Sequence, residues 1–531
     1  MKFKIILILF LSLGLVSCYK DAYRSNNINV PNKVCFQATK LQGCPEETFY
    51  INENGSKTIA ILEIDEQGRF INENQADSIL NYIKQKSEEK PKHRPIIMTY
   101  IHGWNHNALE VDENWYIGGL PFKETTENDS FFKGDLRRFG RTIHNLYASQ
   151  NSVINARISK NIGLQDDSVK VDQQRDIIGI YISWKGKLYP KPLNYATFWN
   201  RKAVSEEIGR GDLQRFLLQL ETIAKPNKVD NSENSILISI GHSFGGSALY
   251  NAISPILLSR FFQSVEDQRS ASNKKNSKTT TNDKIPLRGY GDIVVLINPA
   301  IEATRFVSLR EAVWRERLKN PQLFDNNTKP LFVSIGGSGD TATRRAFKAG
   351  RSIHTFFTEN YRNTHLIDGN GSAKTGSEYI EDEKNLDITA IGNYSPFYTH
   401  WIAQTRDYTN FNESDHKSIS KTSLLDLSPA ACEFSIESIP LTAYANMTYD
   451  STTPLLIADH FVSRYSIPNK YADWPRNEPI KTTNANSTTW KNNPYWFVRA
   501  SKDMISSHTN IWNRQVGCFI LEVLLRNNVA S

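Results

Sequence analysis

Short apolar segments rich in β-branched residues alternate along this 531-residue chain with segments of helical periodicity. Strands are expected at 57–65, 94–104, 175–186, 235–240, 291–300, 329–340 and 493–500, with amphipathic helices at 74–86 and 213–224. Continuously apolar strands separated by helices are typical of a parallel sheet whose two faces are both covered. The sequence therefore predicts an α/β fold, with a mostly parallel sheet flanked by helices.

The expected strand at 235–240 runs into the sequence Gly241-His242-Ser243-Phe244-Gly245, and a helical pattern follows directly. A strand that turns at G-x-S-x-G into a helix is typical of a nucleophile elbow, a strained turn with a serine at its tip. The residues two before and two after the serine must be small, and both are glycine here. Ser243 is therefore the candidate nucleophile, and the alternative is a serine in an ordinary glycine-rich turn. His242 leaves the chain in a different direction and is expected to pack beneath the elbow.

The N-terminal sequence MKFKIILILFLSLGLVSCYK has two lysines before an apolar run from Ile5 to Val16. The run is too short to span a bilayer comfortably and is typical of a signal peptide. Leu15-Val16-Ser17-Cys18 resembles the lipobox of bacterial lipoproteins, which implies a signal peptide at 1–17 and a lipid on Cys18. We therefore expect a protein of the bacterial cell envelope that is held at a membrane by its lipid. An ordinary signal peptide with an incidental cysteine is the alternative.

The chain has 63 Lys and Arg residues against 56 Asp and Glu, and the net charge of +7 is spread along its length. This mild excess predicts no nucleic-acid partner. Apart from Cys18 the cysteines are Cys35, Cys44, Cys432 and Cys518, and an exported chain permits disulfides among them. Cys35 and Cys44 are close enough to close a small loop, whereas Cys518 lies in an apolar segment and is expected to be a buried thiol.

Composition and strand spacing divide the mature chain into parts. The expected parts are a tether and N-terminal segment at 18–56 with a first small strand or two, a core at 57–344, an insertion at 345–492 and the end of the core at 493–531. Within the core, 264–285 has low complexity and is expected to be a disordered loop. The insertion is too long for an ordinary connection and is aromatic-rich at 391–411, so we expect a cap or lid. An independent second domain is the alternative.

The ordered strands, the GHSFGG sequence and a histidine after the last strand resemble an α/β-hydrolase of the lipase and esterase type. The resemblance covers roughly residues 94 to 344 and 493 to 531. It implies a triad in the chain order Ser, acid, His. The acid is expected on the loop after the second strand past the elbow strand, which is Asp340 in GGSGDTATRR. Some members use the preceding strand, which would nominate Glu302 in NPAIEA.

Among the histidines after Ser243, only His508 follows a clear strand and precedes a helical pattern. It is expected as the base, at the carboxyl edge of the sheet where the elbow also points. The backbone N–H of Phe244, directly after the serine, is one expected oxyanion donor. The other is the N–H of Trp104, because His102-Gly103-Trp104 resembles the HG motif of the family.

These features predict a serine hydrolase that cleaves small-molecule or lipid carboxylic esters through an acyl-enzyme. No metal ion or organic cofactor is implied. Peptidases, thioesterases and acyltransferases use the same residues. The alternative from another class is a non-catalytic lipoprotein of the same fold that binds a partner through residues 345–492.

Overall fold

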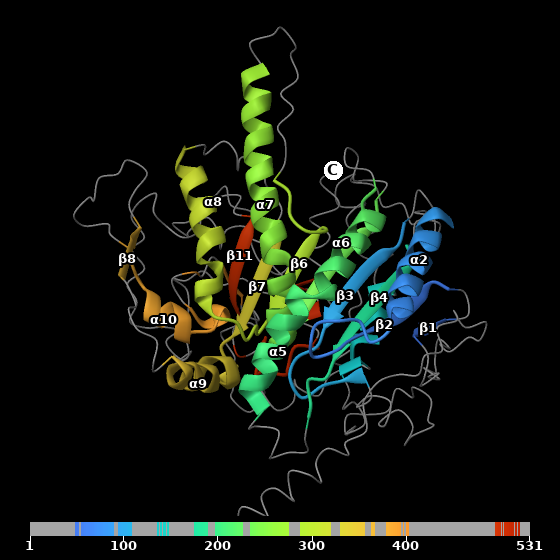
Figure 1. Cartoon of the computed structure of the whole chain (residues 1–531), viewed down its shortest axis with the longest axis horizontal. Coiled ribbons are helices and arrows are strands. Elements are labelled where there is room, and N and C mark those ends of the chain that lie inside the picture. The colour runs from blue at the N-terminus through green and yellow to red at the C-terminus, as the bar shows by residue number, and fades with distance from the viewer. Residues whose placement is uncertain are drawn as a thin grey trace, which may run out of the picture.

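In the computed structural model of the chain, shown in Figure 1, nine strands of the described residues form one sheet. In spatial order they are β1 (Phe49–Ile51), β2 (Lys57–Ile64), β4 (Ile177–Trp184), β3 (Ile96–Ile101), β5 (Ile236–His242), β6 (Ile293–Ile297), β7 (Phe332–Gly337), β11 (Tyr495–Ala500) and β10 (His400–Ile402). β1 and β2 are antiparallel, and the other neighbouring pairs are parallel. The predicted α/β architecture with a mostly parallel sheet is confirmed.

The structure describes residues 48–52, 55–89, 94–108, most of 135–147, 175–188, 197–226, 234–274, 287–319, 330–355, 363–366, most of 379–402 and most of 494–520. The expected lipidation site Cys18 and the cysteines Cys35, Cys44, Cys432 and Cys518 lie outside these residues. Within them, no helix has both the length and the apolar character required to cross a bilayer.

Side chains of the central strands alternate between two hydrophobic clusters because successive residues of a strand point to opposite faces. In β3, Ile97 and Ile101 belong to one cluster, and Ile96, Met98 and Tyr100 belong to the other. Residues on both faces are buried, which explains why the central strands are mostly apolar and do not alternate between apolar and polar residues.

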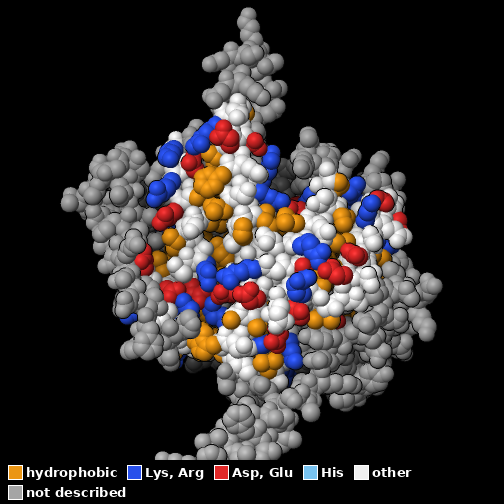
Figure 2. Space-filling model, in the orientation of Figure 1, with side chains coloured by type: hydrophobic (Ala, Val, Ile, Leu, Met, Phe, Trp, Pro, Cys, Tyr) orange, Lys and Arg blue, Asp and Glu red, His pale blue; other side chains and the backbone are white. Residues whose placement is uncertain are grey.

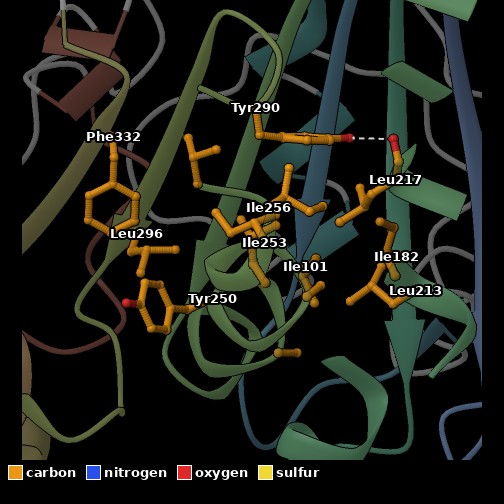
Figure 3. Packing of buried hydrophobic residues seen from close by; sticks show 14 of the residues in the cluster. Ile101, Ile182, Leu213, Leu217, Tyr250, Ile253, Ile256, Tyr290, Leu296 and Phe332 are labelled. Carbon is orange, nitrogen blue, oxygen red and sulfur yellow. Dashed lines mark hydrogen bonds between the residues drawn. The ribbon is translucent and has the colours of Figure 1, made fainter. Parts of the chain in front are cut away.

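The first face of the sheet is covered by helices that follow the strands. They are α2 (Glu73–Glu89), α5 (Phe198–Arg210), α6 (Asp212–Ala224), α7 (Phe244–Lys274) and α8 (Val307–Lys319). Figure 3 shows side chains of α6 and α7 interleaved with those of the strands beneath them. In this layer the Tyr290 hydroxyl donates a hydrogen bond of 2.8 Å to the Leu217 carbonyl oxygen.

The opposite face is covered by two segments that are far apart in the chain. Helical residues of the segment 135–147 bring Phe139 onto Tyr100, with 5.5 Å between the ring centroids. Trp512, which lies shortly after the last strand, contacts the same tyrosine with its ring centroid at 4.7 Å. The predicted C-terminal helix is described only around Val516 and Phe519, both of which are buried in this layer.

The expectation of a disordered loop at 264–285 is wrong for its first half, because α7 continues to Lys274. Val265 is buried in the core, and Arg269 forms a 2.8 Å ion pair with Glu316 of α8. The polar composition therefore belongs to the solvated side of a long helix, and Figure 2 shows basic and acidic side chains next to one another there. Residues 275–286 lie outside the described part of the chain.

The expected boundary between core and insertion also differs from the structure. The sheet begins at β1, within the N-terminal segment where a first small strand was expected after the tether. Inside the expected insertion, β10 pairs with β11 and extends the sheet. The insertion also contributes α9 (Phe347–His354), the antiparallel pair β8 (Asn363–Leu366) and β9 (Tyr379–Asp382), α10 (Glu383–Ile388) and the 3₁₀ helix η8 (Ile391–Asn393). Phe347 of α9, Leu386 of α10 and Ile391 of η8 join the main core, so these three helices belong to the core rather than to a cap.

The aromatic centre of the first face should be a major contributor to stability. Phe332 is fully buried against the rings of Tyr250, Phe306 and Phe497. Phe332→Ala is expected to lower the free energy of unfolding by about 3–5 kcal/mol, because it leaves a cavity. Phe262→Ala is the matched control, since this ring is 49% exposed and its loss should cost no more than about 0.5 kcal/mol. Urea denaturation of both variants measures the difference, and equal losses would contradict the packing described.

Candidate active site

Three parallel strands end at one edge of the sheet and place polar side chains there. Ser243 directly follows β5, Asp340 follows β7 and His508 follows β11. Because the carboxyl ends of parallel strands meet at the same edge, residues separated by more than 260 positions in the chain become neighbours. The structure thus brings together the serine, the carboxylate and the histidine that the sequence singled out.

The three side chains form a continuous hydrogen-bonded chain. His508 Nε2 lies 2.8 Å from Ser243 Oγ, and His508 Nδ1 lies 2.9 Å from Asp340 Oδ2. A carboxylate can only accept, so Nδ1 carries the proton and Nε2 is the acceptor for the serine hydroxyl. An imidazole held in this tautomer can take the proton of Ser243 as its oxygen attacks an electrophile.

The backbone at Ser243 has the strained geometry of a sharp strand-to-helix turn. Its φ angle is +55°, a region that residues with a side chain rarely adopt. The turn is fixed by the Ser243 N–H, which donates to the Ile297 carbonyl oxygen at 3.1 Å. At Gly245 a Cβ atom would lie 2.1 Å from the Ile101 carbonyl oxygen, so only glycine fits. The close approach of this turn to β3 explains the glycine that the sequence motif requires.

Strain of this kind is concentrated at the same edge of the sheet. In the described part of the chain, the non-glycine residues with positive φ are Asn105 at +72°, Ser243 at +55° and Asn298 at +45°. They follow β3, β5 and β6, which are adjacent strands. Backbone strain clusters at functional sites when the surrounding structure can hold it, and this edge is therefore the candidate site.

The loop after β3 lies against the strained turn. A Cβ atom at Gly103 would be only 2.8 Å from Ser243 Cβ, and Trp104 is the next residue. On the other side of the serine, Phe244 is the first residue of α7, so its backbone N–H has no acceptor within the helix. Both residues expected to supply oxyanion donors therefore lie beside Ser243.

Asp340 is completely buried and is held by a chain of polar groups. The Thr343 N–H donates to Oδ1 at 3.1 Å, and the Thr343 hydroxyl donates to Oδ2. Asn393 of η8 donates to Thr343 Oγ1 at 2.9 Å, and Arg499 of β11 donates to Asn393 Oδ1 at 2.8 Å. The segment expected to be a cap thus contributes a residue that supports the carboxylate.

These contacts favour the charged form of Asp340. Burial by itself would raise its pKa, but the hydrogen bond and charge of His508 and the two hydrogen bonds from Thr343 outweigh burial. The pKa of Asp340 is therefore lowered from its ordinary value, and the group is a carboxylate at neutral pH.

Glu302, the alternative acid, is buried among basic side chains. It is 1% exposed, with Lys202 Nζ at 2.8 Å, Arg351 Nε at 3.1 Å and Arg305 Nε at 3.8 Å from its carboxylate oxygens. Its carboxylate is neutralised by these cations, and it is Asp340 that contacts His508. Glu302 is thus a buried residue that is ion-paired with Lys202 of α5 and Arg351 of α9.

His242 packs beneath the turn as expected, but it also makes a polar contact. Its ring centroid lies 5.0 Å from that of His508, and its Nε2 is 2.9 Å from the His508 carbonyl oxygen. His102 has a comparable buried position, with Nδ1 at 2.8 Å from the Gly103 carbonyl oxygen and Nε2 accepting the Trp184 N–H at 3.1 Å. Both rings are therefore part of the framework around the loop after β3.

Sequence reasoning missed several supporting residues. Thr343 and Asn393 hold Asp340, and Asn298 is the strained residue after β6. Asp135 accepts a 2.6 Å hydrogen bond from the Tyr100 hydroxyl and a 2.7 Å bond from Trp512 Nε1, so it anchors the segment after His508. Only Asn298 has a local signal, since Asn-Pro marks a turn at the end of a strand.

Acid should destabilise the fold through the two buried histidines. Burial, and to a smaller extent the charge of His106, lowers the pKa of His102 from 6.5 to about 4. Burial and the charge of His508 lower the pKa of His242 from 6.5 to about 3. Below pH 6.5 the unfolded chain binds protons at these rings that the folded chain does not bind, so the free energy of unfolding falls as the pH falls.

The free energy of unfolding falls between pH 6.5 and about pH 4 through His102, and between pH 6.5 and about pH 3 through His242. Urea midpoints measured in steps through this window should decline for the unsubstituted protein. His242→Gln removes one of the two rings and should show a shallower decline. Parallel curves for the two proteins would contradict the neutral, buried state of His242.

Comparisons with protein-family models, with curated proteins and with solved structures give no match to this chain. The function is therefore inferred from the geometry of the site. The relevant features are the hydrogen-bonded chain from Ser243 to Asp340, the strained turn that carries the serine, and the adjacent loop after β3.

Proposed function

We propose that the chain is a serine hydrolase of the α/β-hydrolase type that cleaves carboxylic esters through an acyl-enzyme. The single observation that carries this proposal is the hydrogen-bonded chain Ser243–His508–Asp340 at a strained strand-to-helix turn. The order along the sequence is serine, aspartate, histidine, and the aspartate follows the second strand past the turn.

Each residue then has a defined role in the first half of the reaction. Ser243 Oγ attacks the ester carbonyl carbon while its proton passes to His508 Nε2. The carbonyl oxygen becomes negatively charged and accepts hydrogen bonds from the N–H groups of Phe244 and Trp104. When the tetrahedral intermediate collapses, the bond to the leaving alcohol breaks and that oxygen takes the proton from His508. The acyl group remains on Ser243 as an ester.

Water completes the cycle by the same route. It attacks the acyl-enzyme carbonyl carbon and gives its proton to His508, which returns it to Ser243 Oγ as the carboxylic acid leaves. Asp340 holds the tautomer of the imidazole throughout and stabilises the imidazolium ion that forms twice in each turnover. Its buried carboxylate is suited to this role because Thr343 preorganises it.

The residues beside Ser243 favour a substrate with an apolar part. Trp104 contacts Phe198 with 5.4 Å between ring centroids, and Phe198 contacts Phe244 at 5.0 Å. Trp104 and Phe198 are only partly buried, so apolar surface remains near the serine. We propose small-molecule or lipid esters as the substrate class, with the protein held at the membrane of a bacterial envelope by a lipid on Cys18.

The proposed nucleophile can be tested without knowledge of the natural substrate. A fluorophosphonate probe should label the full chain at Ser243, because the hydroxyl is activated by His508. Ser243→Ala should abolish labelling, since alanine has no hydroxyl for His508 to activate. Mass spectrometry of the labelled peptide identifies the site. An unlabelled but folded wild-type protein, or a labelled Ala variant, would overturn the mechanism.

Two carboxylate variants separate the roles of Asp340 and Glu302. Asp340→Asn should keep the shape of the site but favour the wrong imidazole tautomer, lowering turnover of a short-chain ester by roughly 10⁴-fold. Glu302→Gln should leave the turnover of the folded protein near normal. It should instead reduce stability by about 3–5 kcal/mol, because it leaves cations buried without their carboxylate.

Ester turnover and urea denaturation are measured on both variants, with circular dichroism as the check on folding. A folded Asp340→Asn protein with near-normal turnover would show that Asp340 does not orient the histidine. A Glu302→Gln protein that is stable but inactive would transfer the role of the acid to Glu302.

A further inference from the structure

His508 lies in a part of the chain that has no regular secondary structure to hold it. The described residues between β11 and Val516 form turns and bends. The side chain of His508 is 23% exposed. A base on such a loop needs fixed contacts, because a displacement of about 1 Å from the reacting atoms can lower the rate about 100-fold.

The backbone carbonyl of His508 supplies an unusual anchor point. Its oxygen lies 2.9 Å from His242 Nε2 and 3.0 Å from Asn298 Nδ2. His242 ends β5 and Asn298 follows β6, and these strands are neighbours in the sheet. The His508 carbonyl oxygen therefore accepts hydrogen bonds from two side chains at the ends of neighbouring strands.

The hydrogen bond defines the chemical state of His242. A carbonyl oxygen can only accept, so Nε2 of His242 carries a proton. Nδ1 is buried and has no hydrogen-bond partner among the described residues, so it is the unprotonated nitrogen. Burial and the charge of His508 lower the pKa of His242 to about 3, and the ring stays neutral. His242 thus remains a donor while His508 gains and loses its proton.

Asn298 is built into the same framework. Its Oδ1 accepts the Gly337 N–H at 2.8 Å, at the end of β7, while its Nδ2 donates to His508. Its φ of +45° is tolerated by asparagine better than by most residues. In this conformation the side-chain amide of Asn298 forms hydrogen bonds both to the end of β7 and to the backbone of His508.

We propose that His242 and Asn298 are positioning residues, which fix the backbone of His508 through its carbonyl oxygen and so hold Nε2 at Ser243 Oγ. This inference rests on the proposed function, since it concerns the base of that reaction. The competing explanation is that His242 only fills space beneath the turn. The positioning explanation requires residue 242 to carry a hydrogen-bond donor at the position of Nε2. The space-filling explanation requires only a side chain of suitable volume.

Two polar substitutions separate these explanations. His242→Gln can place its amide NH₂ near the position of Nε2, within reach of the His508 carbonyl oxygen. His242→Asn places its amide near the position of Nδ1 and cannot reach. The Gln variant should label with a fluorophosphonate at a rate within about threefold of wild type, whereas the Asn variant should lose on the order of 10-fold to 100-fold.

A second readout separates positioning from general damage. With a short-chain ester, the Asn variant should show a lower kcat and an unchanged KM, because the apolar binding surface is untouched. Circular dichroism and urea denaturation check that both variants are folded. Equal rates for the Gln and Asn variants would overturn the proposal, and so would a loss confined to KM.

Asn298→Gly provides an independent test, because glycine accepts the positive φ and removes only the side chain. The remaining donor still holds the carbonyl in part when the other is lost, so the variant with both His242→Asn and Asn298→Gly should lose more than the product of the single losses. A simple product would mean that the two residues act separately and would overturn the shared anchor. A folded wild-type protein that is never labelled at Ser243 would overturn the proposed function and the inference with it. Normal wild-type labelling with unimpaired variants would overturn the inference alone.

Discussion

The parallel pairing of β5, β6 and β7 is the constraint on which the candidate site depends. It aligns the ends of the three strands, so that Ser243, Asn298 and the turn before Asp340 lie side by side. The hydrogen bond from Ser243 N–H to Ile297 O ties the strained turn to β6. The bond from Gly337 N–H to Asn298 Oδ1 ties β6 to β7. The sheet can hold an unfavourable backbone conformation because these contacts are made at the end of a well-packed core.

The charge state of each buried titratable group around the site depends on its burial and on the hydrogen-bond donors and charged groups that contact it. Asp340 stays charged because His508 and Thr343 donate to it, whereas His242 stays neutral because burial and the charge of His508 lower its pKa. Glu302 is equally buried but is matched to cations from α5, α9 and its own turn. Two acidic residues on neighbouring loops thus have different surroundings, and only one of them contacts the histidine.

Much of the fold was predictable because its strands have a strong local pattern. Apolar, β-branched segments identified the seven expected strands, and G-x-S-x-G placed the turn. Prediction failed where local composition and tertiary contacts disagree. Polar residues after Val265 resembled a loop, yet they form the solvated side of α7 and pair with α8. Residues around Ile391 were expected to form a cap, yet they pack into the main core. A sequence pattern does not show whether an inserted segment packs on the sheet or forms a separate unit.

The sequence by itself determined the α/β class and the turn at Ser243, because these depend on local periodicity. It offered Asp340 and His508 as candidates through their place relative to the expected strands and the resemblance to α/β-hydrolases. Only the tertiary structure decided between Asp340 and Glu302 as the partner of the histidine, since both follow strands and both are carboxylates. It also assigned the contacts of His242, Asn298, Thr343 and Asn393. Hydrogen bonds between residues that are distant in the chain depend on how the strands are ordered and how loops pack at their ends, and no local sequence pattern encodes that arrangement.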